Sequence, residues 1–243
     1  MATRVVIPDG SKMPKNPIVI EGFPSKGFVS TITARYMIDE MGMQPIGYLE
    51  SDNLHSVAVI HDSRPMRPIR VYCKDNIVVL FSEIIIPIPE VPEFSRAIIE
   101  WLKQAKPDKV VLLAGISGKD TEKDHEIFAM ANNPQVTQKL RDLKVNGVSE
   151  GMMTGISSEL LLYCVENGIS WISLMAETKN LPDPLAAASM LQILTRILDL
   201  KVDTKRLIEE GKKIEEMFKE ITSQLQRGKE GYKAMENYSP MYG

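Results

Sequence analysis

Three glycine-rich turns carry the residues whose types and spacing are best suited to anion chemistry. They span residues 22–27, 115–118 and 151–155, and each adjoins an apolar run that is typical of a strand or a helix. In α/β proteins such turns lie at the carboxyl ends of strands, where helix N-termini present free N–H groups to anions. Together the turns predict a phosphate-sized site at one edge of a sheet. The residues that would form it are Ser25, Lys26, Gly27, Gly118, Gly155 and Glu177.

The same glycines have a second interpretation, which is that they only permit tight connections between strands and helices. None of the three turns matches the G-x-x-x-x-G-K-[ST] pattern of a P-loop or the G-x-G-x-x-G spacing of a dinucleotide-binding turn. Spacing alone does not decide between the two interpretations.

The sequence contains few candidate catalytic residues. Glu177 follows a buried strand and is suited to general-base work or a ribose contact, whereas Asp183 before Pro184 fits a helix N-cap. Ser157 and Ser158 lack a G-x-S-x-G elbow. The two cysteines fall in apolar patterns and the three histidines are scattered over strand edges and loops. We therefore predict no catalytic residues, no metal site and no cofactor.

A more specific signal stands at the end of the chain, which finishes Pro240-Met241-Tyr242-Gly243. A hydrophobic residue, a tyrosine and any third residue with a free carboxylate form a compact recognition element. It offers an apolar side chain for a pocket, a hydroxyl for a hydrogen bond and an anion for a lysine. The alternative is a terminus that is merely disordered.

Periodicity predicts an α/β layered core over residues 1–202, with a largely parallel sheet and an antiparallel extension. Buried strands are expected at 17–22, 109–116 and 169–177, and short strands over 46–83 with a hairpin turn at 74–76. Helices are expected at 26–42, 94–105, 136–144 and 183–200, and the segment 147–168 is expected to be a glycine-rich turn that leads into a further helix, with Gly42 and Gly168 as stop signals. The stretch 117–134 is read as irregular.

Beyond the core the composition of the sequence changes. Residues 203–227 are rich in charge, and Leu207, Ile214 and Ile221 recur seven apart, which predicts a charged amphipathic helix. That helix packs either against a partner subunit or back on its own core. Residues 228–243 show no periodicity and are predicted to be a flexible tail.

Composition excludes several classes of protein without selecting one. The chain has 243 residues, 44% hydrophobic and 25% charged, with 29 Lys+Arg against 32 Asp+Glu for a net charge of -3. This balance argues against nucleic acid as a partner. Two cysteines leave no disulfide framework and favour the cytoplasm. The apolar runs are too short or too broken to span a membrane, and no signal peptide is recognised.

Four segments, in this order, resemble the proteasome assembly chaperone family and specifically its archaeal homologues. They are GFPSKGFVSTITARYMID (22–39), VVLLAGI (110–116), GVSEGMMTGISSELL (147–161) and AETKNLPDPLAAASML (176–191). The resemblance covers roughly residues 17–200 and the terminal tripeptide. It implies a core similar to the nucleoside phosphorylase-like fold, a homo-oligomer (tetramer or pentamer), and a C-terminal hydrophobic–Tyr–X (HbYX) tail that docks on the proteasome α-ring.

In that family the tail carboxylate meets a lysine between neighbouring α subunits, and Met241, Tyr242 and Gly243 match the pattern position by position. The sequence therefore predicts a non-enzymatic assembly chaperone or activator-like protein that binds proteasome α subunits. The competing hypothesis is a small-molecule or nucleotide-binding enzyme, phosphorylase-like or ligase-like, that uses the glycine-rich turns. Family members have been labelled ATP-grasp ligases by similarity, but the chain shows no ATP-grasp pattern.

Overall fold

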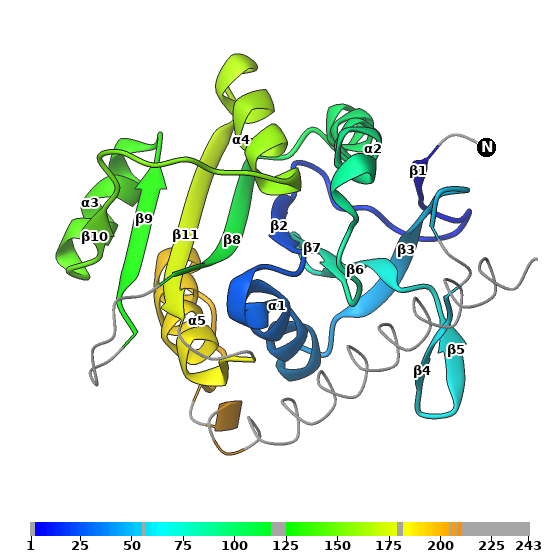
Figure 1. The fold of residues 1–243 in the computed structure, drawn as a ribbon, viewed down its shortest axis with the longest axis horizontal. Coiled ribbons are helices and arrows are strands. Elements are labelled where there is room, and N and C mark those ends of the chain that lie inside the picture. Colours follow the sequence, from blue (N-terminus) through cyan, green and yellow to red (C-terminus); the bar gives the residue numbers. More distant parts are fainter. Residues whose placement is uncertain are drawn as a thin grey trace, which may run out of the picture.

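The fold is an α/β sandwich in which helices cover both faces of one twisted sheet (Figure 1). We describe it from a computed structural model of the chain. The structure describes residues 3–54, 57–117, 125–178, 182–204, 206, 207 and 209. Gly118, nearly all of the predicted 203–227 helix, the 228–243 tail and the tripeptide Met241–Gly243 lie outside the described residues.

The described residues form a nine-stranded sheet in the order β1-β3-β6-β7-β2-β8-β11-β9-β10 and a separate β4-β5 hairpin. The four central strands β7, β2, β8 and β11 are mutually parallel, while β1, β3 and β6 extend the sheet in antiparallel fashion. The strands are β1 (Arg4–Val6), β2 (Ile18–Gly22), β3 (Gln44–Glu50), β4 (Val59–His61), β5 (Arg64–Met66), β6 (Ile69–Lys74), β7 (Ile77–Ser82), β8 (Lys109–Ser117), β9 (Ile127–Ala131), β10 (Asn146–Gly147) and β11 (Ser170–Thr178).

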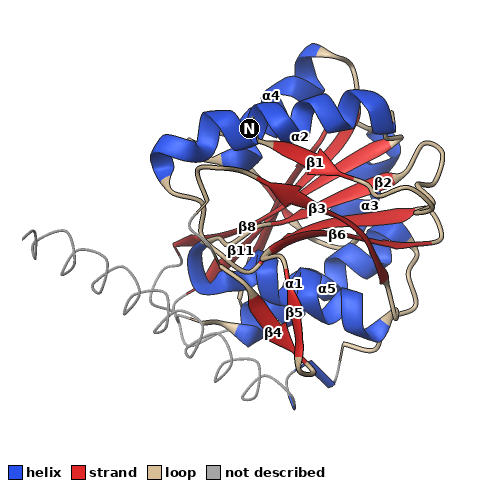
Figure 2. Cartoon of the chain, turned by 90° about the vertical axis from the view of Figure 1, so that its right-hand side faces the viewer, coloured by secondary structure: helices blue, strands red, loops and turns tan. Residues whose placement is uncertain are grey.

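Two helical layers enclose this sheet, and the core accordingly divides into two clusters of buried side chains. Figure 2 shows α2 and α4 on one face and α1 and α5 on the other, where α3 also packs. The helices are α1 (Val29–Glu40), α2 (Val91–Ala105), α3 (Pro134–Asp142), α4 (Ile156–Glu166) and α5 (Pro184–Leu198), with short 3-10 turns η1 (Lys26–Phe28) and η2 (Ile88–Glu90).

Alternation along each central strand decides which cluster a side chain joins. In β8, Val111 and Leu113 pack with α1 and α5, and Val110 and Leu112 pack with α2 and α4. All four are fully buried. Because both faces are covered, the central strands are apolar at nearly every position, as expected for a parallel sheet between helices. The predicted layered α/β fold is confirmed.

The helix-stop glycines, the N-cap of α5 and the hairpin turn lie where the sequence predicted them. Gly42 and Gly168 follow the ends of α1 and α4 with φ of 60° and 63°, which suits glycine after a helix. Asp183 is the N-cap of α5, and its carboxylate accepts a hydrogen bond from the Ala186 N–H at 3.1 Å. The β6–β7 hairpin turns at Asp75, whose φ is 52°.

At least four elements differ from the sequence-based expectation, and one of them is the two-residue strand β10, which was not predicted. The stretch 117–134 is not irregular throughout, because β9 (127–131) lies in it and pairs antiparallel to β11. Strand β1 was not predicted, since a three-residue edge strand leaves almost no periodic signal. Within the 46–83 run, β7 joins the parallel core beside β2 as well as the antiparallel extension.

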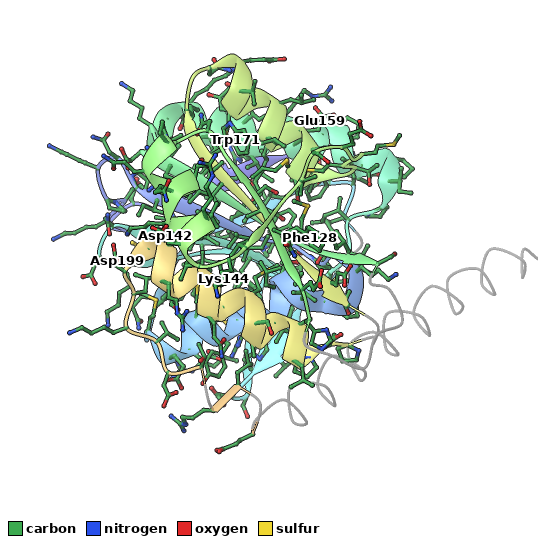
Figure 3. The ribbon with its side chains drawn as sticks, turned by 90° about the vertical axis from the view of Figure 1, so that its left-hand side faces the viewer. Phe128, Asp142, Lys144, Glu159, Trp171 and Asp199 are labelled. Atoms are coloured by element: carbon green, nitrogen blue, oxygen red, sulfur yellow. The ribbon has the colours of Figure 1, made fainter. Side chains whose placement is uncertain are left out.

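Figure 3 shows the edge of the sheet that carries β9, with Phe128 on that strand and Asp142 and Lys144 at the end of α3. Here α3 is tied to the end of α5 by an ion pair of 2.8 Å between Lys139 Nζ and an Asp199 carboxylate oxygen. Both side chains are largely exposed, so this pair contributes little to stability.

The first residues after α5 return to the core. Tyr36 Oη donates a hydrogen bond of 2.7 Å to the Asp203 carbonyl, and Arg206 Nη1 lies 3.3 Å from Glu40 Oε1. Leu207, the first of the predicted heptad positions, is fully buried in the cluster formed with α1 and α5. The beginning of the 203–227 segment therefore packs on its own core. None of the described helices is long and apolar enough to cross a membrane.

Candidate functional site

The carboxyl ends of β2, β8 and β11 meet at one edge of the sheet, and the first glycine-rich turn lies across them. Ser25 Oγ accepts a hydrogen bond of 2.8 Å from the Gly115 N–H of β8 and lies 2.7 Å from Ser30 Oγ of α1. Lys26 Nζ donates to Ser117 Oγ at 2.5 Å. The structure thus places Ser25 and Lys26 beside the second turn.

Two glycines in this region are required by close packing. A Cβ at Gly115 would lie 1.9 Å from the Lys26 carbonyl oxygen, and one at Gly27 would lie 2.3 Å from Thr178 Oγ1. Gly27 also has a φ of 68°, which favours glycine. The turn after β2 is therefore pressed against β8 and β11. These contacts support the structural interpretation of the two glycines.

A second group of polar side chains surrounds the N-terminus of α5. The Thr178 hydroxyl donates to Asp183 Oδ2 at 2.8 Å, and the Asp183 N–H donates to the Gly27 carbonyl at 2.9 Å. His125 Nε2 lies 3.4 Å from Asp183 Oδ1, and its Nδ1 lies 3.0 Å from the Glu177 carbonyl. Asp183 is fully buried, so it is more than a helix cap: it joins three segments of the chain.

Glu177 and Gly155 occupy different positions relative to this cluster. The Glu177 backbone pairs with the segment 125–127 through its N–H and its carbonyl, and its side chain is half-buried. Gly155 is the N-cap of α4, on the other face of the sheet, with a φ of 83°. Of the predicted anion-site residues, Ser25, Lys26 and Gly27 lie together because they are consecutive in the chain, and Gly155 does not join them.

A buried carboxyl group that sequence reasoning missed lies beneath the start of α4. Glu21, near the end of β2, is 1% exposed. Its Oε1 accepts the Phe23 N–H at 3.0 Å, and its Oε2 accepts the Ser157 hydroxyl at 2.8 Å. Burial raises the pKa of Glu21 from 4.5 to about 7, while hydrogen bonds from Ser157, Phe23 and Leu113 lower it. The available signal was a single acid inside an apolar strand, directly before Gly22.

A second buried acid, Glu83, follows β7 and collects three cationic or ionisable side chains. Arg70 Nη2 lies 2.9 Å from Glu83 Oε2, and His61 Nε2 lies 2.7 Å from Oε1. Arg35 Nη1 is farther away, at 3.9 Å from Oε1. The Arg70 guanidinium also lies over the Phe81 ring, 5.7 Å from its centroid. This cluster fastens the β4-β5 hairpin, through His61, to the core.

The structure offers little nucleophilic chemistry in the described residues. Burial raises the pKa of the Cys164 thiol to about 11, and burial followed by the charge of Asp75 raises the pKa of Cys73. Ser157 is bonded to Glu21, and Ser158 donates to the Gly155 carbonyl at 2.7 Å. The described part of the chain contains no cluster of three His, Cys, Asp or Glu side chains able to hold a metal ion.

Taken together, the fold and this edge define an α/β sandwich protein whose strand ends are closed by tightly packed turns. A family model identifies it more narrowly: the chain belongs to the PAC2 family, whose model matches residues 19–222. A curated relative is an uncharacterised protein of Methanocaldococcus jannaschii, 32% identical over 211 residues, which are 86% of this chain and 87% of that protein.

Solved structures agree with this assignment. The chain is similar to Pyrococcus furiosus PbaA, described as an archaeal homologue of proteasome-assembly chaperone, with 30% identity and a TM-score of 0.82. The match covers 93% of this chain and 99% of PbaA. Pyrococcus furiosus PbaB, described as an archaeal proteasome activator, has the same fold at 20% identity and a TM-score of 0.73, covering 91% of this chain and 99% of PbaB.

Proposed function

We propose that this protein is a proteasome assembly chaperone or activator-like protein that binds the proteasome α-ring. The observation that carries the proposal is the similarity to PbaA, which extends over 93% of the chain at 30% identity. Membership of the PAC2 family supports it. The protein would act by binding in the cytoplasm, without a catalytic step of its own, and the packed strand ends fit that role.

In this proposal the binding element is the terminal tripeptide Met241-Tyr242-Gly243. Met241 would fill an apolar pocket, the Tyr242 hydroxyl would form a hydrogen bond, and the Gly243 carboxylate would pair with a lysine of an α subunit. A 16-residue tail that starts at Gly228 would reach about 50 Å when extended. Each tail alone would bind weakly.

Several tails are therefore needed, and we propose that the protein is a homo-oligomer, a tetramer or pentamer as the family resemblance implies. Linked binding elements gain affinity of 10² or more through effective concentration. Leu207 is already buried on its own core, so a partner subunit would pack on heptad positions beyond it. The 1–202 core would then serve as the body of the assembly, with the 203–227 helix and the tail attached.

The experiment is co-elution of the full-length protein with purified archaeal proteasome α-rings in size-exclusion chromatography. Removal of Met241–Gly243, or Tyr242→Ala, should abolish co-elution because the pocket-filling and hydrogen-bonding groups are lost. Tyr238→Ala is the matched control, since Tyr238 is a tail tyrosine outside the tripeptide. Co-elution that survives removal of the tripeptide would refute the tail mechanism and leave only a role for the core.

A second candidate is a small-molecule or nucleotide-binding enzyme that uses the turns at the sheet edge. The observation in its favour is the convergence of Ser25, Lys26 and Ser117, including the 2.5 Å contact between Lys26 Nζ and Ser117 Oγ. It predicts a thermal shift with phosphate, nucleosides or ATP that Lys26→Gln or a substitution of Gly155 abolishes. A flat response to all three ligands would exclude this candidate.

A further inference from the structure

Helix α4 carries apolar side chains on its outer side as well as on its inner side. The inner residues that pack against the sheet are Ile156, Leu160 and Cys164. On the outer side Leu162 is 56% exposed and Val165 is 55% exposed, and because they are three residues apart they lie next to each other on the helix. We call these two residues, with the half-buried Leu161 beside them, the α4 stripe.

The neighbouring helix α2 shows how a helix of this layer that faces solvent is built. Its inner side is apolar, and its outer side carries the exposed charges of Arg96, Glu100 and Lys103. Figures 1 and 2 show both helices in one layer, across the sheet from α1 and α5. A helix that is apolar on both its inner and its outer side is typical of a buried position. The α4 stripe is therefore expected to be covered by protein in the assembled molecule.

Two copies of α4 are a poor match for each other. A two-fold contact centred on the stripe would run the two helices antiparallel and bring Glu159 of one copy toward Glu166 of the other. Both are exposed acids, and like charges brought together across an interface oppose association. The surface that covers the stripe should therefore be a different one.

The same chain supplies a second apolar row, in the predicted 203–227 helix. Leu207 is buried on the α1 and α5 side of the sheet, and the described residues end at Glu209. Heptad spacing continues the row in the sequence with Ile214, Phe218, Ile221 and Leu225, which we call the 214–225 row. A helix rises about 1.5 Å per residue, so one that continues from Leu207 reaches Ile214 after only about 10 Å. Its own α4 lies across the sheet from that starting point.

We propose that the 214–225 row of one copy packs against the α4 stripe of the next copy. The idea rests on the proposed homo-oligomer and names the two surfaces that would hold it together. Contact between two different surfaces is heterologous, and its repetition around an axis closes a ring. A cyclic pentamer requires such a contact, because a two-fold contact only joins copies in pairs.

The test compares two variants of the full-length protein by sedimentation equilibrium. Leu162→Gln with Val165→Gln alters only the α4 stripe, and Phe218→Gln with Ile221→Gln alters only the 214–225 row. Each pair should raise the dissociation constant of the assembly by about 100-fold, because two large apolar side chains lose their burial. Ile60→Gln is the matched control: Ile60 is 61% exposed on β4, and the variant should assemble like the unmodified protein. Thermal midpoints report that each variant keeps its fold.

Mixing the two variants gives the sharper result. Each is deficient in assembly alone, but the intact row of one can bind the intact stripe of the other, so the mixture should form a 1:1 dimer. A mixture that stays monomeric would overturn the proposal, because packing within one chain cannot be restored by mixing. Assembly lost only in the stripe variant would equally overturn it, in favour of an α4–α4 contact, as would two variants that assemble like the unmodified protein.

These measurements separate the proposal from the proposed function. An unmodified protein that is a monomer would refute the homo-oligomer and this interface together. An unmodified oligomer that both variants leave intact would refute this interface alone. None of the measurements includes the proteasome, so co-elution with α-rings reports independently on binding through the tail.

Discussion

The buried carboxyl of Glu21 makes a quantitative prediction about how folding stability depends on pH. Its pKa is about 7 in the folded protein against 4.5 in an unfolded chain, because burial disfavours the charged form. A pKa that is raised on folding means that the native state holds the proton more tightly. The contribution that Glu21 therefore makes to the free energy of unfolding is fully present below pH 4.5 and is lost as pH rises through about 7.

The size of the effect follows from this interval. One pKa unit corresponds to about 1.4 kcal/mol, so the full change between pH 4.5 and pH 8 is about 3 kcal/mol. Glu21→Gln removes the titration and keeps a side chain of the same shape. We compare the two proteins by a difference: the free energy of unfolding of the variant minus that of the unmodified protein. This difference should increase by about 3 kcal/mol from pH 4.5 to pH 8, whatever the difference is at pH 4.5.

The assay is urea denaturation of both proteins at fixed concentration and at a series of pH values from 4.5 to 8.5. Glu159→Gln is the control, because Glu159 is an exposed acid in the first turn of α4, the helix that also carries Ser157. Its stability curve should run parallel to that of the unmodified protein above pH 5.5. Parallel curves for Glu21→Gln would refute the reasoning, as would a carbon NMR titration that places the Glu21 midpoint below pH 5.5.

Three further substitutions test the packing around the strand ends and the buried charges. Gly115→Ala should cost about 3 kcal/mol of stability, because its Cβ would meet the Lys26 carbonyl at 1.9 Å; a loss below about 1 kcal/mol in urea denaturation would show that the turn has room to move. Asp183→Ala removes the cap and the Thr178 hydrogen bond, and should lower stability by about 2–3 kcal/mol by the same measurement, whereas a loss confined to a few tenths would reduce its role to a weak cap. Glu83→Ala leaves Arg70 buried without its anion and should cost about 3–5 kcal/mol; a thermal midpoint within 2 °C of the unmodified protein would contradict this.

The fold could be predicted from the sequence because its main signals are local. Asp183 before Pro184 starts α5, Gly42 and Gly168 end their helices, and the apolar run 110–113 is a central strand. Strands β1 and β9 escaped prediction, since their existence depends on a neighbouring strand that offers hydrogen bonds. Edge pairings of this kind leave almost no mark on composition or periodicity.

The candidate site was less predictable, for a related reason. Glycine spacing placed Ser25 and Lys26 at a strand end, but it could not show that the Lys26 carbonyl and Thr178 fill the space beside Gly115. The pairing of Glu83 with Arg70 and His61 depends on how β6, β7 and the β4-β5 hairpin are arranged in three dimensions. The burial of the Glu21 carboxyl group depends on α4, whose Ser157 bonds to it, and this long-range contact is not visible in the sequence.

The most direct test of the central claim is the affinity of the full-length protein for immobilised proteasome α-rings, measured with and without Met241–Gly243. We expect saturable binding that falls by 10² or more when the tripeptide is removed, because several weak tail contacts act together. Equal affinity of the two proteins would contradict the claim that the tail carries the interaction. Absence of binding by the unmodified protein would contradict the proposed function itself.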